Sequence, residues 1–471
     1  TDGTFNLNGA VATVGTLTAG TINLAAATAL TVDSGTFGGS LTGSGSLIKA
    51  TTGILTLTGP NLSFTGATTI SLGELIIQNA GSLGTSAITV ASGAILDLNN
   101  IGITNAITVA SGGIIENGPT AASPAVVAAL SGTNSIDTVL TGTTGLAKDG
   151  SGELSLTTPN FFTGAVTANT AGAVIKAAFL DDNSSSLGAG SLSDPTKLQL
   201  GAGAALEFTG TTNTVSSRSF TLTDSAGIAA GVGAGTLTFT SDAKIDLVGA
   251  DPQLKLSANN SGNNIFRASL TDADILAGNG IKTLTVDGTG TWILGGSANR
   301  FKGDVRVDAG VGTTIGLENG ALPTGATVGV AQGSTLRWES GNTAPVKLSL
   351  DAGVAAKLDL GTNDIVFTTA PAVVGTGSVT LEKQGTGAMR IADNLSAPSV
   401  NMTVSGGLLS IGEGSTLGNI TLSSGARLGG KGTVGIANVG TGAFLAPGNS
   451  PGTLYATTLV LGPGSTFDWE V

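Results

Sequence analysis

The chain has 471 residues, no cysteine and no histidine, a net charge of −12, and charged residues at only 11% of its positions. These counts exclude a disulfide framework, a thiolate or imidazole metal site, a Ser-His-Asp triad and a histidine pH switch. The 19 basic residues are scattered singly, which argues against nucleic acid and anionic membranes as partners.

Glycine occupies 75 positions, about twice the usual share of roughly 7%, and it shows no collagen period. Hydrophobic residues make up 40% of the chain, so a core can be buried. Thr, Ser, Ala and Gly stand where a typical domain has Lys and Glu. Length alone would suggest about three domains, but this composition is typical of stacked strands joined by tight turns.

One glycine-rich pattern occurs four times, at residues 45–66, 144–164, 284–303 and 379–394. The first two copies share Leu-x-Lys, a glycine, a Leu-x-Leu segment, Pro-Asn, Phe and a final glycine, in that order. The third copy has Val286 in place of the lysine, and the fourth lacks the aromatic residue after Asn394. Self-similarity of this kind indicates a repeat architecture.

A second element follows each copy. It consists of Leu and Gly, a short apolar-polar alternation, a glycine turn and another alternation, at residues 83–98, 187–208, 322–338 and 417–428. Period-two patterning predicts strands at residues 54–58, 198–200, 236–240, 282–286 and 379–381. Asn-Gly pairs at 117–118, 279–280 and 319–320 predict turns. Residues 172–182 form the one tract with any helical character.

Short strands with frequent glycine turns suit either a series of β-sandwiches or a β-solenoid. Turns that recur every few residues, with Leu, Ile, Val or Ala inward and Thr, Ser, Asn or Gln outward, favour the solenoid. We therefore predict an all-β, right-handed parallel β-helix, an elongated rod of roughly 20–30 residues per coil. No stretch reaches the ~18 apolar residues of a membrane-spanning helix, so no membrane insertion of this segment is expected.

The copies at residues 45–66 and 144–164 resemble the passenger-associated β-strand repeat of bacterial autotransporters. Residues 428–434, 445–454 and 463–471 are similar to the end of such passengers. The resemblance implies a bacterial protein that is exported and folds as a parallel β-helix outside the cell. We divide the chain into residues 1–404, a solenoid with three repeat units and the start of a fourth, and residues 405–471, a C-terminal solenoid segment.

Several residues invite a chemical function. Pairs of acids suit glycoside cleavage, but acids at turns more often cap or solvate the chain. No calcium-loop motif occurs, and the glycine clusters at 43–45 and 231–235 precede no helix that would complete a phosphate site. We therefore predict no catalytic residue, no cofactor and no metal site. The candidates weighed were the acids Asp181, Asp182, Asp272 and Asp274 and the oxygen-rich segments 181–183 and 259–264.

Recognition motifs were weighed in the same way. Lys302-Gly303-Asp304 is similar to an integrin-type tripeptide, but the repeat explains Gly303. Tryptophans suggest a carbohydrate-stacking platform, with an exposed Trp338 beside Arg337 as the adhesive candidate. Recurrence of aromatics at one repeat position instead predicts core stacking. The aromatic residues concerned are Trp292, Trp338, Trp469, Phe64, Phe162 and Phe301.

The sequence thus predicts a non-enzymatic, extracellular, structural or adhesive protein at the bacterial cell surface. Its loops would contact a ligand on a host or neighbouring cell, and the insertions at residues 181–196 and 240–264 are where such loops are expected. The alternative is a fibre subunit that self-associates end to end through uncovered coil edges. A third reading is a polysaccharide-degrading β-helix enzyme.

Overall fold

The computed structural model describes residues 3–468, except 10, 100, 102, 104, 106, 111–112, 117–127, 131–133, 137–139, 141–144, 149, 278–279, 297–300, 308–311, 324–325 and 449–451. The chain forms two compact units. Unit 1 comprises Thr1–Ala229 and Asp242–Ala250, and unit 2 comprises Ala230–Ser241 and Asp251–Val471. The predicted boundary between residues 404 and 405 lies inside unit 2 and stays a prediction.

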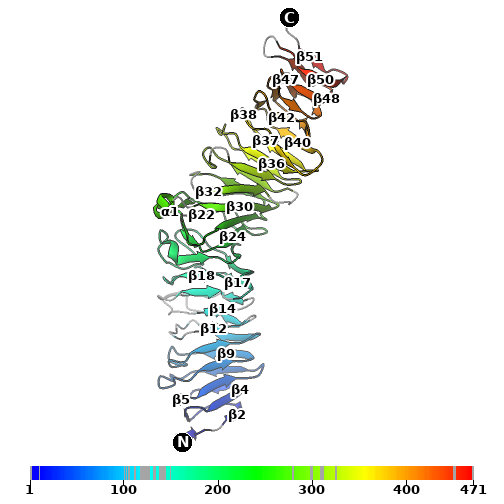
Figure 1. The fold of residues 1–471 in the computed structure, drawn as a ribbon. Helices are drawn as coiled ribbons and strands as arrows, with labels where there is room; N and C mark the ends of the chain where they lie inside the picture. The colour runs from blue at the N-terminus through cyan, green and yellow to red at the C-terminus, as the bar shows by residue number, and fades with distance from the viewer. Residues whose placement is uncertain are drawn as a thin grey trace. The chain divides into compact units, whose positions relative to one another are not determined.

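Unit 1 consists of short strands stacked on one another (Figure 1). A 3₁₀ turn, Pro195–Lys197, precedes β20. The strands are β1 Thr4–Leu7, β2 Val11–Thr16, β3 Thr21–Leu24, β4 Ala29–Phe37, β5 Ser40–Gly43, β6 Ser46–Lys49, β7 Ile54–Leu57, β8 Thr68–Ile70, β9 Gly73–Ile77, β10 Ile88–Val90, β11 Ala94–Asp97, β12 Ile107–Val109, β13 Ile114–Glu116, β14 Ala128–Leu130, β15 Asn134–Ile136, β16 Leu146–Lys148, β17 Gly152–Leu156, β18 Val166–Ala168, β19 Ala173–Ala177, β20 Leu198–Leu200, β21 Ala204–Phe208, β22 Thr214–Ser216, β23 Phe220–Leu222, β24 Ser225–Ala230 and β26 Lys244–Leu247.

Unit 2 repeats this construction and, among its described residues, adds one short helix, α1 Asp272–Ala277. Six of its strands, β38, β41, β44, β47, β49 and β51, form one sheet in that order. Its strands are β25 Leu237–Phe239, β27 Gln253–Ala258, β28 Asn263–Phe266, β29 Ser269–Leu270, β30 Ile281–Gly288, β31 Thr291–Leu294, β32 Phe301–Val307, β33 Thr314–Leu317, β34 Thr327–Val330, β35 Thr335–Trp338, β36 Lys347–Asp351, β37 Ala355–Asp359, β38 Ile365–Phe367, β39 Ala372–Val374, β40 Val379–Gln384, β41 Met389–Ile391, β42 Ser396–Ala397, β43 Val400–Val404, β44 Leu408–Ile411, β45 Thr416–Leu417, β46 Ile420–Leu422, β47 Arg427–Gly430, β48 Thr433–Val439, β49 Phe444–Pro447, β50 Tyr455–Leu461 and β51 Thr466–Phe467.

Hydrogen-bonded strands are parallel and lie one coil apart along the chain. Ladder partners are 17 positions apart at Thr4 and Thr21 and 32 apart at Val166 and Leu198. Parallel pairing at such short separations means that the chain returns in the same direction one level up. The predicted parallel β-solenoid is confirmed, and its right hand stays a prediction.

Alternation of burial along each strand builds the core. In β19 the side chains of Ala173, Ile175 and Ala177 are buried and the two between them are half-buried. The helical character expected for residues 172–182 is therefore wrong. Alanine favours a helix locally, but the ladder from Glu153 to Val174 and its neighbours fixes this segment as a strand.

Aromatic side chains fill part of the core of unit 2. Phe266 contacts Phe239 and Trp292 edge to face, with ring centroids 5.8 Å apart in the first pair and 6.4 Å apart in the second. Trp338 and Phe367 form a similar pair at 5.9 Å. Such pairs stabilise beyond the area they bury, so the aromatic residues hold successive coils together.

The expected turn at 319–320 is confirmed, because Gly320 has a φ of +74°; the pairs at 117–118 and 279–280 lie wholly or partly outside the described residues. Within the described part of the chain, no helix is long and apolar enough to span a membrane. The expected binding loop at 240–264 is wrong, since this tract contains β26 and β27. Its apolar residues alternate and pack inward, which makes it part of the coils.

Candidate functional site

The lysine of the repeat is buried. Lys49, Lys148 and Lys383 are all 0–1% exposed. The Nζ atom of Lys383 donates to the carbonyls of Gly385 (3.0 Å) and Gly406 (2.7 Å). The Nζ atom of Lys49 likewise donates to carbonyls in its own turn and the next coil's turn. These two ammonium groups therefore tie neighbouring coils, and the repeat lysine has a structural role.

Burial opposes the charge on these lysines. Desolvation lowers the pKa of Lys383 to about 8, although Asp359 and Asp364 act in the opposite direction. Desolvation also lowers the pKa of Lys49, against the charge of Asp33. A buried amine with a lowered pKa is a common feature of nucleophilic lysines, but both amines donate hydrogen bonds to backbone carbonyls of two coils, so their contacts serve the scaffold.

The asparagine of the repeat bridges coils as well. Asn61 accepts a hydrogen bond from the backbone N–H of Leu41 at 2.6 Å and donates to the carbonyl of Ser82 at 2.6 Å. Asn160 makes the same two kinds of contact, at 2.7 Å each. One amide side chain thus satisfies a donor on one side and an acceptor on the other, which explains why the motif contains asparagine there.

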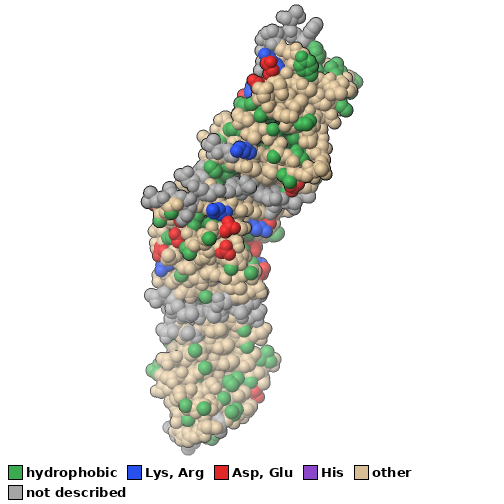
Figure 2. Space-filling model, in the orientation of Figure 1, with side chains coloured by type: hydrophobic (Ala, Val, Ile, Leu, Met, Phe, Trp, Pro, Cys, Tyr) green, Lys and Arg blue, Asp and Glu red, His purple; other side chains and the backbone are tan. Residues whose placement is uncertain are grey.

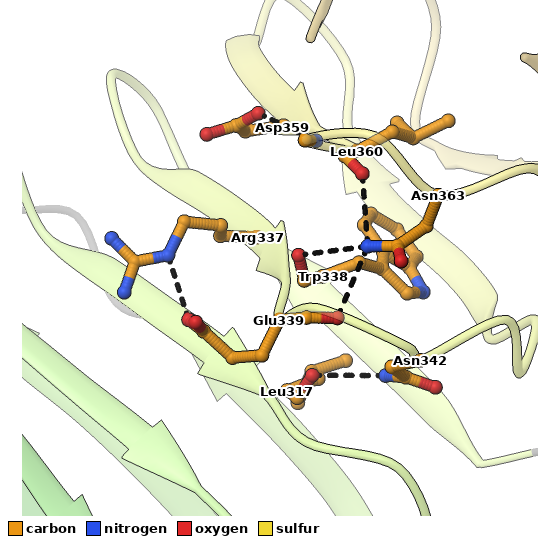
Figure 3. Close-up of polar contacts among 9 residues, drawn as sticks. Leu317, Arg337, Trp338, Glu339, Asn342, Asp359, Leu360 and Asn363 are labelled. Atoms are coloured by element: carbon orange, nitrogen blue, oxygen red, sulfur yellow. Dashed lines mark hydrogen bonds and ion pairs between the residues drawn. The ribbon is translucent and has the colours of Figure 1, made fainter. Parts of the chain in front are cut away.

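Trp338 lies in a polar network in unit 2 (Figure 3). Its indole is 2% exposed and its Nε1 donates to the carbonyl of Ala344 at 3.0 Å. Arg337 pairs with Glu339 at 2.7 Å, and Asn363 donates to the carbonyls of Trp338 and Glu339. The indole packs in the core, as core stacking of the aromatic residues predicts, so the alternative of an exposed, adhesive Trp338 beside Arg337 does not hold.

The other aromatic expectations have clear outcomes. Phe64, Phe162 and Phe301 are 0–3% exposed, which confirms core stacking at this repeat position. Trp292 is fully buried, so it offers no stacking face to a sugar. Trp469 lies outside the described residues.

The acidic candidates serve turns. Asp274 accepts a hydrogen bond from Thr271 Oγ1 at 2.8 Å at the start of α1. Asp181 accepts from the backbone N–H groups of Asn183 and Ser184, at 3.1 and 2.7 Å. Among the described residues there is no group of three or more acids close enough to hold a metal ion. These contacts are the capping roles expected of acids at turns.

Lys302-Gly303-Asp304 lies in β32, and its side chains lie outside the described part of the structure. The segment at 181–196 runs between β19 and β20 and contains no strand. Together with Asn160, Phe161 and Arg218 it lines a cavity of about 300 Å³.

Arg218 is the unusual side chain of this cavity. It is 2% exposed, and its Nη2 donates to the carbonyl of Gly188 at 2.8 Å. Its Nε and Nη1 have no hydrogen-bond partner. Burial lowers its pKa to about 10, while the charge of Asp182 acts to raise it. The sequence did not single out Arg218, which lies in no repeat motif.

The two units are parallel β-solenoids in which a repeated glycine-rich motif supplies core lysine, asparagine and phenylalanine. Three segments, residues 47–77, 146–174 and 284–311, match the family model described as passenger-associated-transport-repeat. These segments overlap the first three copies found in the sequence, so the predicted resemblance to autotransporter passengers is confirmed.

A named relative supports the same assignment. The chain is 29% identical over 439 residues to the adhesin BmaC autotransporter of Brucella suis biovar 1 (strain 1330). The alignment covers 82% of this chain and 12% of the adhesin, so the chain spans about an eighth of that relative's length. No solved structure matches the chain.

Proposed function

We propose that this chain is an adhesive, non-catalytic segment of a bacterial cell-surface protein. The observation that carries the proposal is the similarity to an autotransporter adhesin over 82% of the chain. The repeat residues are consistent with this proposal, because the lysines, asparagines and aromatic residues of the motif are buried and serve the scaffold. Contact with a ligand is left to loops between the strands, as is usual for rigid scaffolds.

The proposal is tested by coating fluorescent beads with the purified chain and counting beads bound to cultured mammalian cells and to bacterial cells. We expect binding above that of albumin-coated beads, and competition by the soluble chain. Binding equal to albumin on every cell type would contradict an adhesive role. Incubation with a panel of polysaccharides should release no reducing ends; release that tracks the purified chain would contradict the non-catalytic assignment.

A second candidate is a fibre subunit, and β50 favours it. All seven of its residues are exposed, including Tyr455 and Val460. It pairs with β48 and, among the described residues, with no other strand. An uncovered edge is a template for another strand. Electron microscopy over a wide concentration range tests this candidate: filaments support it, and single particles at every concentration contradict it.

A further inference from the structure

The cavity of unit 1 arises from an insertion in one coil. Ladder partners Gly152 and Ala173 are 21 positions apart, whereas Val174 and Ala205, one coil later, are 31 apart. The extra residues form the loop that lines the cavity of about 300 Å³ together with Arg218. That volume is at the lower end of the range for small-molecule sites, and it is about right for a single sugar ring.

The guanidinium of Arg218 lacks a counter-ion. It makes no ion pair with any described residue, and two of its three nitrogens have no hydrogen-bond partner. A buried charge without a partner is costly, and an anion placed against it offsets that cost. Arginine presents its N–H groups in a planar fork that matches a carboxylate. The site is therefore short of one negative group.

The remaining lining suits the body of a sugar. Phe161 is 51% exposed and lines the cavity, so its ring offers an apolar face. Asn183, Ser184 and Ser191 also line the cavity and carry amide and hydroxyl groups. Asp182 is exposed, and its Oδ1 accepts a hydrogen bond from the Ser217 N–H at 2.7 Å. Its negative charge repels anions and disfavours groups with more than one charge.

We propose that this cavity binds a carboxylate-bearing sugar unit of the hexuronate class. The carboxylate pairs with the guanidinium of Arg218, the ring lies against Phe161, and the hydroxyls contact the polar groups of the 181–191 loop. The proposal deepens the adhesive function proposed above, because it names the ligand class for one loop of the scaffold.

The test compares two ligands that differ only in the carboxylate. Calorimetric titration of the full chain with an oligogalacturonate should show binding, and neutral oligogalactose of equal length should bind at least about tenfold more weakly, as expected for loss of a charge-assisted hydrogen bond. Equal affinity for both, or no binding of the oligogalacturonate, would overturn the proposal.

Variants assign the binding to the cavity. Arg218→Gln should lose about tenfold or more in affinity. Asp182→Asn keeps an acceptor for Ser217 and removes the repelling charge, so it should bind the oligogalacturonate a few-fold more tightly. Lys176→Gln removes a positive charge paired with Glu153 on a strand outside the cavity and should change nothing.

Asp182→Asn keeps the test decisive if Arg218→Gln fails to fold, because unchanged or weakened binding in Asp182→Asn contradicts the proposal. The bead assay distinguishes failure of the hexuronate site from failure of the adhesive function. Beads that adhere without oligogalacturonate binding would refute this inference and leave the adhesive function standing. Sugar binding without bead adhesion would refute the adhesive function alone.

Discussion

Replacement of Asn363 by alanine should weaken the stacking of two neighbouring coils in unit 2. The side chain is 8% exposed. Its Nδ2 donates to the carbonyls of Glu339 and Leu360 at 3.0 Å each and of Trp338 at 3.3 Å (Figure 3). Its Oδ1 accepts from the Gly341 N–H at 2.9 Å. Two amide protons and one acceptor make about three bonds, each worth ~1 kcal/mol net. The expected loss is therefore about 3 kcal/mol.

Hydrogen exchange measured by mass spectrometry suits this test, because a long repeat protein need not unfold in one step. A loss of about 3 kcal/mol should lower the protection of the β35 peptide by roughly 100-fold. Asn438→Ala is the matched control, since Asn438 is exposed on β48 of the same unit; it should change protection little. Equal protection in the two variants would refute the bridging role assigned to Asn363.

Three further predictions follow from burial. Burial lowers the pKa of Lys383 from 10.5 to about 8, so between these pH values the unfolded chain binds more protons than the folded chain. The free energy of unfolding should therefore rise with pH across that window, by at most about 3 kcal/mol. Urea unfolding of wild type and Lys383→Met at pH 7 and 10 checks this, and an equal response of the two proteins to pH would contradict it. Gly66→Ala would place a Cβ 1.6 Å from a carbonyl oxygen of the preceding coil and should lower the thermal midpoint by several degrees, consistent with overpacking of about 1–3 kcal/mol. Phe64→Ala should cost about 3–5 kcal/mol by urea denaturation, whereas Leu62→Ala, at a side chain 73% exposed, should cost under about 0.5 kcal/mol; similar losses would refute the core position of Phe64.

The sequence predicted the coils because each strand of a β-solenoid has alternating buried and outward residues, which produce a period of two in the sequence. Alternating apolar residues and a recurring Lys-Gly-Leu-Asn-Phe pattern marked the core positions, and Phe64 and Phe162 are buried as the recurrence predicts. The helical character considered for residues 172–182 was wrong because alanine content describes local preference, whereas pairing with the neighbouring coil decides the conformation.

The sequence predicted the loop of the candidate site but not its arginine. The insertion at 181–196 was expected to carry a binding loop, and it does line the cavity. Arg218 was missed because its importance depends on Gly188, which lies 30 positions earlier, and on the absence of a counter-ion. Neither fact has a local sequence pattern. Trp338 lies in the core, as predicted for the aromatic residues, although a single aromatic residue beside arginine does not by itself reveal which face of the strand is buried.

Background-free disulfide trapping tests the central claim, that parallel coils stack in the register described, because the chain contains no cysteine. Thr69, Thr89 and Thr108 occupy one column on three successive coils. Adjacent coils lie about 4.8 Å apart, within the range for a disulfide, whereas two coils span more than the ~7 Å limit. Thr89→Cys with Thr108→Cys should form an intramolecular disulfide on mild oxidation, and Thr69→Cys with Thr108→Cys should not. Failure of the first pair, or equal cross-linking of both, would contradict the stacked solenoid.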